Sequence, residues 1–308
     1  MNFDRIKNIC PEFHELLVNP NVVEIIVDSG DDIYYSMPGK LENFELKLED
    51  SVVEQLAIAL IDMSGKSVND NTGNIHFSLG ELRVNVCTPR ISQNGYIFNI
   101  MKLPAIEPTI DDLIKWNAIT KEGSEILKKA IKEGKSILAA GGVGSGITTL
   151  CNILIKMINT NERVVTIEKV GTLQSNRKRI AKLVTANGLN EELPSLVDTA
   201  SMMRGDYLVL NQIEGAEAFN FIELLRDGSS GIGVIKASNI FDSLKRLELK
   251  IAQADYSISA EEIKYMISEG FDYVVYQERL NDGSRKITGI AEIKFVDGRF
   301  DLDLVYRN

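Results

Sequence analysis

Short apolar runs alternate with amphipathic segments through the second half of the chain. Four of these runs have the length and composition of buried strands and cover residues 136–140, 163–168, 206–213 and 231–238. Segments with helical character lie between them, at residues 151–158, 193–203 and 215–227. Strands that alternate with helices in this way favour a mostly parallel sheet covered by helices. The pattern therefore predicts an α/β fold for this part of the chain.

The first hundred residues follow a different pattern. Short β-rich runs at 21–29, 32–37, 75–91 and 94–103 surround one segment, 49–65, with apolar residues at helical spacing. We predict a mixed α+β domain at 1–103, a linker with two prolines at 104–112, and a second domain at 113–308. The C-terminal end of the second domain, from residue 271 onward, is typical of an antiparallel meander.

A glycine-rich stretch, GGVGSGITTL, follows the first apolar strand of the second domain and opens its next helix. The phosphate-binding loop pattern is Gly, any four residues, Gly, Lys, then Ser or Thr. Gly141, Gly146 and Thr148 match this pattern, but Ile147 replaces the lysine. Backbone N–H groups and the helix N-terminus of such a loop face a phosphate, and Thr148 would hold Mg²⁺ if a nucleotide binds. The residues predicted to bind nucleotide are Gly141, Gly142, Val143, Gly144, Ser145, Gly146, Ile147, Thr148 and Thr149.

Composition narrows the classes of function. The net charge of −10 argues against nucleic acid as the main partner, because phosphate backbones need a basic surface. Three separated cysteines and two histidines make a disulfide framework or a zinc site a poor fit and indicate a reduced, cytoplasmic chain. Residues 136–155 carry no charge, but their central glycines favour a strand, a turn and a helix over a membrane span. The basic run at 177–182 is interpreted as a solvated helix face.

Motifs along nearly the whole chain resemble those of the secretion and pilus motor ATPases. This family includes the traffic ATPases of type II secretion, type IV pili, tight-adherence pili and type IV conjugative secretion. The similar segments, in the family's order, include NPNVVEIIVDSGDDIYY, LRVNVCTPRIS, GGVGSGITTLCNIL, RVVTIEKVGTLQ, SMMRGDYLVLNQIEGAEAFNFIELL, IKASNIFDSLKRLE and MISEGFDYVVYQERLNDGSRKITGIAEI. The resemblance implies a RecA-like P-loop NTPase core preceded by a smaller α+β, PAS-like domain.

The resemblance also implies cofactors and partners. Family members bind Mg-ATP or ADP and form hexameric rings with nucleotide between the two domains. The expected partners are therefore further copies of this chain or an active paralogue, together with membrane platform proteins of the apparatus. The expected location is the cytoplasm, with a peripheral position at the inner face of the cell membrane as a variant.

The chain departs from the family's pattern at charged positions. In the acidic box Glu168 remains, but Lys169 stands where the family has aspartate. Gln212 replaces the glutamate that positions the attacking water, and Glu214 replaces an arginine. Lys236 replaces the histidine of the histidine box, and Met101 replaces an arginine that helps bind nucleotide at the domain interface. Because phosphoryl transfer depends on positioning and charge neutralisation, we predict a pseudo-ATPase with a structural or regulatory role and weak or absent nucleotide binding.

Two alternatives remain open from the sequence. Lys169 or Lys236 could supply the missing positive charge from another direction, which would make the chain an active or slow ATPase. Alternatively, a glutamine at position 212 can still hydrogen-bond a water without accepting its proton, so the site could sense nucleotide without turnover.

Overall fold

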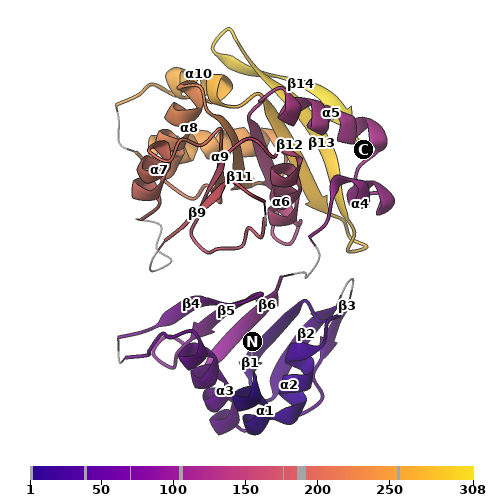
Figure 1. Cartoon of the computed structure of the whole chain (residues 1–308), viewed down its shortest axis with the longest axis vertical. Helices are drawn as coiled ribbons and strands as arrows, with labels where there is room; N and C mark the ends of the chain where they lie inside the picture. Colours follow the sequence, from indigo (N-terminus) through magenta and orange to yellow (C-terminus); the bar gives the residue numbers. More distant parts are fainter. Residues whose placement is uncertain are drawn as a thin grey trace. The chain divides into compact units, whose positions relative to one another are not determined.

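The computed structural model describes residues 3–37, 40–69, 71–103, 107–175, 177–185, 192–254 and 257–308. The chain divides into two compact units, residues 1–106 and 107–308. Each unit has its own β-sheet and its own hydrophobic core (Figure 1). Residues 104–106 of the predicted linker lie outside the described residues. Residues 110–112 of that linker are helical, because a capping box of Thr109 and Asp112 starts a helix at Ile110.

The first unit is an antiparallel sheet with helices on one face (Figure 1). The strand order is β3-β2-β1-β6-β5-β4, with strands β1 (Glu24–Ser29), β2 (Asp32–Met37), β3 (Lys40–Asn43), β4 (Asn74–Leu79), β5 (Leu82–Cys87) and β6 (Ile97–Lys102). The predicted helix is α3 (Asp50–Met63), which buries Leu56 and Leu60 in the core. Two helices were not predicted, α1 (Asp4–Ile9) and α2 (Pro11–Val18), because each is too short for a clear periodicity.

The second unit is built on an eight-stranded sheet in the order β14-β13-β12-β7-β11-β10-β8-β9. Its strands are β7 (Ile137–Gly141), β8 (Val164–Glu168), β9 (Ile180–Val184), β10 (Tyr207–Asn211), β11 (Ser230–Lys236), β12 (Tyr273–Arg279), β13 (Arg285–Val296) and β14 (Arg299–Arg307). Neighbouring strands from β12 to β9 pair in parallel, and β13 and β14 continue the sheet in antiparallel fashion. The predicted parallel sheet and C-terminal meander are thus confirmed.

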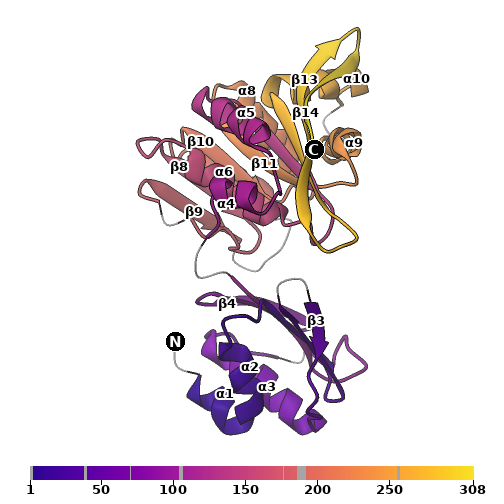
Figure 2. The ribbon, with the colours of Figure 1, turned by 90° about the vertical axis from the view of Figure 1, so that its right-hand side faces the viewer.

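Helices cover both faces of this sheet (Figure 2). On one face α4 (Ile110–Lys115), α5 (Lys121–Lys132) and α6 (Ile147–Met157) share a core with the strands. On the other face lie α7 (Leu193–Ser201), α8 (Glu217–Arg226), α9 (Ile240–Ala252) and α10 (Ala260–Gly270). Strands covered on both faces must be apolar throughout, which explains the continuous apolar runs of β7, β8 and β10.

The uncharged stretch 136–155 forms β7, a turn and α6, as its glycines indicate. In the described part of the chain, no helix combines the length and the apolar character that crossing a bilayer requires.

The basic run at 177–182 is not a helix face, so this interpretation was wrong. Its second half is the edge strand β9, which pairs only with β8 in the sheet order. Its first residue, Arg177, donates hydrogen bonds to the carbonyl oxygens of Ile155 at 3.0 Å, Asn159 at 2.6 Å and Glu162 at 2.8 Å. Arg177 therefore satisfies carbonyl groups at and just beyond the C-terminal end of α6.

Candidate functional site

The residues singled out in the sequence gather at one edge of the second unit's sheet. Strands β7, β8, β10, β11 and β12 run in parallel, so their carboxyl ends meet there. Glu168 pairs in register with Asn211, and Gly141 pairs with both Lys236 and Gln277. Lys169 and Gln212 follow directly after two of these strand ends. The carboxyl edge of an open parallel sheet is where ligands bind in α/β folds, so this edge is the candidate site.

The glycine-rich loop connects β7 to α6 at this edge. Gly144 and Gly146 have left-handed backbone conformations, with φ of +74° and +85°. Glycine adopts this region without steric cost. Gly146 is the N-cap of α6 and makes no side-chain cap hydrogen bond to the first turn of that helix. N–H groups at an uncapped helix start are the groups that would face an anion.

Ile147 does not face that anion position. Its side chain is 6% exposed and belongs to the core that α6 shares with α4, α5 and the sheet. Thr148 and Thr149, the next two residues, are partly exposed in the first helical turn. The first turn therefore carries two partly exposed threonines, but the lysine position of the loop is used for packing.

Glu168 stands at the end of β8. Its side chain is 0% exposed. One carboxylate oxygen accepts hydrogen bonds from the N–H groups of Thr172 at 2.8 Å and Leu173 at 2.9 Å, and from the Thr172 hydroxyl at 3.0 Å. Burial raises the pKa of Glu168, and these hydrogen bonds oppose the rise. Glu168 thus holds the segment that follows β8.

The two lysines considered as substitutes for the loop lysine differ in their surroundings. The ammonium of Lys169 lies 3.4 Å from a carboxylate oxygen of Glu214, and both side chains are partly exposed. Glu214 is therefore a countercharge for Lys169. Lys236 is exposed at the end of β11, and it forms no ion pair with any residue in the described ranges. Gln212 is partly exposed, and its side chain has no hydrogen bond to a described residue.

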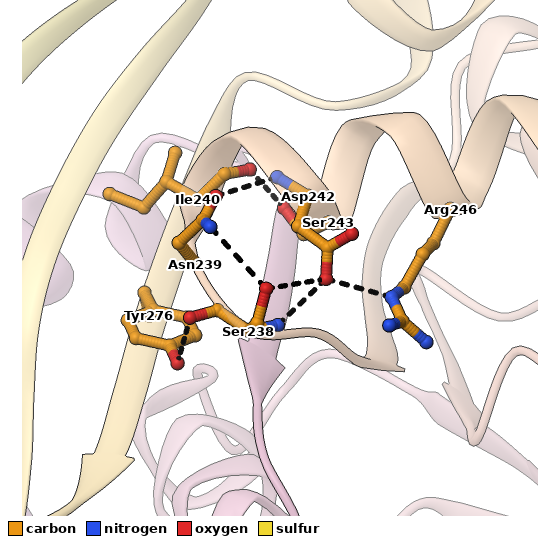
Figure 3. A network of polar contacts seen from close by, with 7 residues as sticks. All are labelled: Ser238, Asn239, Ile240, Asp242, Ser243, Arg246 and Tyr276. Carbon is orange, nitrogen blue, oxygen red and sulfur yellow. Dashed lines mark hydrogen bonds and ion pairs between the residues drawn. The ribbon is translucent and has the colours of Figure 1, made fainter.

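Ser238, in the segment that corresponds to the family's histidine box, is fixed by a hydrogen-bond network (Figure 3). Asp242 accepts hydrogen bonds from the Ser238 N–H at 2.8 Å and the Ser238 hydroxyl at 2.9 Å, and from the Arg246 guanidinium at 2.8 Å. The Ser238 N–H and Arg246 lower the pKa of Asp242. The Tyr276 hydroxyl donates to the Ser238 carbonyl at 2.6 Å. The end of β11 is thereby tied to both α9 and β12.

The sequence did not point to three further residues at the loop, all from the β12–β13 hairpin. Gln277 donates to the Ser145 carbonyl at 2.7 Å, and the Arg285 Nε donates to the Gly144 carbonyl at 3.0 Å. An Arg279 guanidinium nitrogen lies 3.5 Å from the point where a Cβ on Gly144 would stand. The sequence did contain one signal, the NDGS turn, which predicts a hairpin. In that hairpin Arg279 and Arg285 lie opposite each other in register.

The loop fits the phosphate part of a nucleotide better than it fits a metal ion. Ser145 is 1% exposed, and its hydroxyl oxygen has no hydrogen-bond partner. Such a buried polar group is uncommon unless a ligand or water completes it. For magnesium, the loop offers the Thr148 hydroxyl, while one oxygen of Glu168 is taken up by its own segment and the other has no partner among the described residues. Within the described residues, no three His, Cys, Asp or Glu side chains come together as metal ligands.

Comparisons with known proteins agree with this architecture. Residues 12–280 match the family described as type II/IV secretion system protein. An uncharacterized protein of Methanocaldococcus jannaschii is 32% identical over 160 residues, which cover 48% of this chain and 22% of that protein. The type IV secretion system protein VirB11 of Bartonella quintana is 30% identical over 177 residues, covering 55% of this chain and 49% of that protein. The matched regions thus span half or less of these two relatives.

A solved structure extends the similarity to nearly the whole fold. The pilus retraction motor PilT, crystallised with bound ADP, superposes with a TM-score of 0.64 at 16% identity. The superposition covers 98% of this chain and 83% of PilT. At this level of identity the match establishes the shared two-part architecture, including the RecA-like core expected from the sequence.

Proposed function

Because this chain belongs to the type II/IV secretion system protein family, we propose that it serves a pilus or secretion apparatus as a traffic ATPase subunit that does not hydrolyse ATP. The role is structural or regulatory. The observation that carries the proposal is the packing of Ile147 in the core, at the position where a phosphate-loop lysine would reach the β and γ phosphates.

Other residues at the same edge support this proposal. Glu168 is wholly buried, and one of its carboxylate oxygens is taken up by the segment that follows β8. Glu214 balances the charge of Lys169. Gln212 can orient a water but cannot accept its proton at neutral pH. Hydrolysis requires charge neutralisation and a positioned nucleophile together, and these substitutions remove parts of both.

The proposed partners follow from the family. We infer that this chain joins a hexameric ring, either with copies of itself or beside an active paralogue, and that the ring contacts membrane platform proteins. A subunit that does not hydrolyse ATP would then help to complete the ring and its contact surfaces. Mg-ATP or ADP is the proposed cofactor, and Gly141 to Thr149 are its proposed binding residues.

A second candidate is a slow ATPase that uses Lys236. The observation that favours it is the position of Lys236, which is exposed opposite Gly141 in the sheet register and has no countercharge among the described residues. Lys169 is a weaker substitute because of its ion pair with Glu214.

Phosphate release from Mg-ATP by the purified chain separates these candidates. The proposal predicts that wild type, Lys236→Ala and Lys169→Ala all release phosphate no faster than a heat-denatured sample. Thr148→Ala is the control for contaminating ATPases, because any activity of the chain's own loop should fall in this variant. Turnover that disappears in Thr148→Ala would refute the proposal, and its additional loss in Lys236→Ala would establish the slow ATPase.

A further inference from the structure

The β12–β13 hairpin forms a wall beside the phosphate loop. Strand β12 lies next to β7, and Gln277 is in register with Gly141, where the loop begins. Alternation along β12 puts Gln277 and Arg279 on one face of the sheet and Glu278 on the other. Opposite them in β13, Arg285 pairs with Arg279 and donates to the loop carbonyl of Gly144. Two guanidinium groups therefore stand at the loop from which the lysine is missing.

Two buried polar atoms at this junction lack partners. The Ser145 hydroxyl oxygen and the Gln277 side-chain oxygen make no hydrogen bond, and these residues are 1% and 4% exposed. The Gln277 amide nitrogen would lie 3.0 Å from a Cβ placed on Gly146, so this side chain reaches the N-terminus of α6. Buried polar atoms without a partner are uncommon, so a water molecule or a bound ligand is expected to complete these two.

The positive charge of the hairpin is not neutralised locally. Among the described residues, neither Arg279 nor Arg285 forms an ion pair. The acid in the hairpin turn, Asp282, accepts hydrogen bonds from the N–H and hydroxyl of Ser284 instead. Within the described ranges, Arg285 donates through its Nε to the Gly144 carbonyl, and neither terminal nitrogen of its guanidinium has an acceptor. A guanidinium fork of this kind matches the geometry of a phosphate.

We propose that Arg279 and Arg285 replace the loop lysine and hold the phosphates of a nucleoside di- or triphosphate against the loop. The inference rests on the proposed function for the identity of the site, and it adds that the chain binds nucleotide tightly although it does not hydrolyse it. The cations come from the side of β12 and not from α6. They neutralise phosphate charge without bringing a metal ligand or a base, so binding is retained where turnover is not.

Calorimetric titration of the full chain with ADP tests this proposal. Wild type should bind, and Arg279→Ala and Arg285→Ala should each weaken the affinity about tenfold to a hundredfold, as expected for loss of a charged hydrogen bond. The double variant should bind more weakly than either single variant. Lys286→Ala is the matched control, because it removes one positive charge from the same strand on the opposite face, and its affinity should stay within about twofold of wild type.

Pyrophosphate shows whether the phosphates themselves are recognised, and it should compete with ADP in wild type but not in the double variant. Arg285→Lys keeps the charge and should bind ADP better than Arg285→Ala, which separates loss of charge from misfolding. The proposal is wrong if wild type gives no heat with millimolar ADP, or if the double variant binds like wild type. Phosphate release is measured separately: turnover would refute the proposed function alone, and unchanged binding in the double variant would refute the arginine assignment alone.

Discussion

Truncation of Ile147 tests whether the lysine position belongs to the core. The side chain is 6% exposed and packs with the buried residues of α6 and the sheet. Ile147→Ala removes three buried carbons, which amounts to about 2.4 kcal/mol of transfer free energy. The cavity left behind adds to this cost, and substitutions of this kind reduce the free energy of unfolding by about 2–5 kcal/mol. Ile147→Val removes a single carbon and should cost only about 0.5–1.5 kcal/mol.

The assay is urea unfolding, followed by circular dichroism and by the fluorescence of Trp116, the single tryptophan, which belongs to the second unit. In thermal unfolding of a unit of this size, each kcal/mol of unfolding free energy lost should lower Tm by about 2–4 °C. Val143→Ala is the control in the same loop, because Val143 is 87% exposed and its truncation should change stability by less than about 0.5 kcal/mol. If Ile147→Ala is as stable as Val143→Ala, position 147 faces the solvent, and the main argument against hydrolysis fails.

Two further predictions concern buried ionisable groups. Burial raises the pKa of Glu168 in the folded chain, so its contribution to stability is fully present below the ordinary pKa of 4.5 and is lost as the pH rises through the raised value. Glu168→Gln keeps an acceptor for Thr172 and Leu173. At pH 8 it should be more stable than wild type, by about 1.4 kcal/mol of unfolding free energy for each unit by which the Glu168 pKa is raised. In urea titrations the gain should vanish near pH 4, and an equal difference at both pH values would contradict this. Cys151 is fully buried and burial raises its thiol pKa, whereas Cys87 is partly exposed. Iodoacetamide at pH 8 should therefore modify Cys87 in the native chain and Cys151 only in urea, as measured by peptide mass spectrometry. Equal rates of modification would show that the α6 core opens.

The sequence predicted the elements whose burial fixes their composition. The strands β7, β8 and β10 are covered on both faces, so their apolar runs were clear, and the glycine turn identified the loop between β7 and α6. Strand β9 was missed because it lies at the sheet edge and is only partly buried, so its lysine and alanine residues dilute the pattern. The basic residues beside it suggested a solvated helix, whereas Arg177 serves carbonyl groups near the end of α6.

The candidate site was predicted only in part, because contacts between distant residues decide which charges remain available. The sequence offered Lys169 as a substitute cation, but Glu214, on the neighbouring strand end, balances its charge. Glu168 remains from the family's acidic box, but the sequence does not show that its carboxylate is completely buried. The sequence does not predict a role for Arg279 and Arg285, because nothing in the local pattern shows that β12 inserts beside β7.

The insertion of β12 beside β7 also bears on how the site is made during synthesis. Gln277 and Arg285 contact loop carbonyls that lie 132 and 141 positions earlier in the chain. The residues of the glycine turn and α6 leave the ribosome early, but the wall of the loop cannot exist until β12 and β13 have been added. Contacts of such long separation form slowly, because a large loop must close first. A nascent chain without β12 and β13 therefore lacks Gln277, Arg279 and Arg285 at the loop, and under the arginine proposal it should bind nucleotide phosphates more weakly.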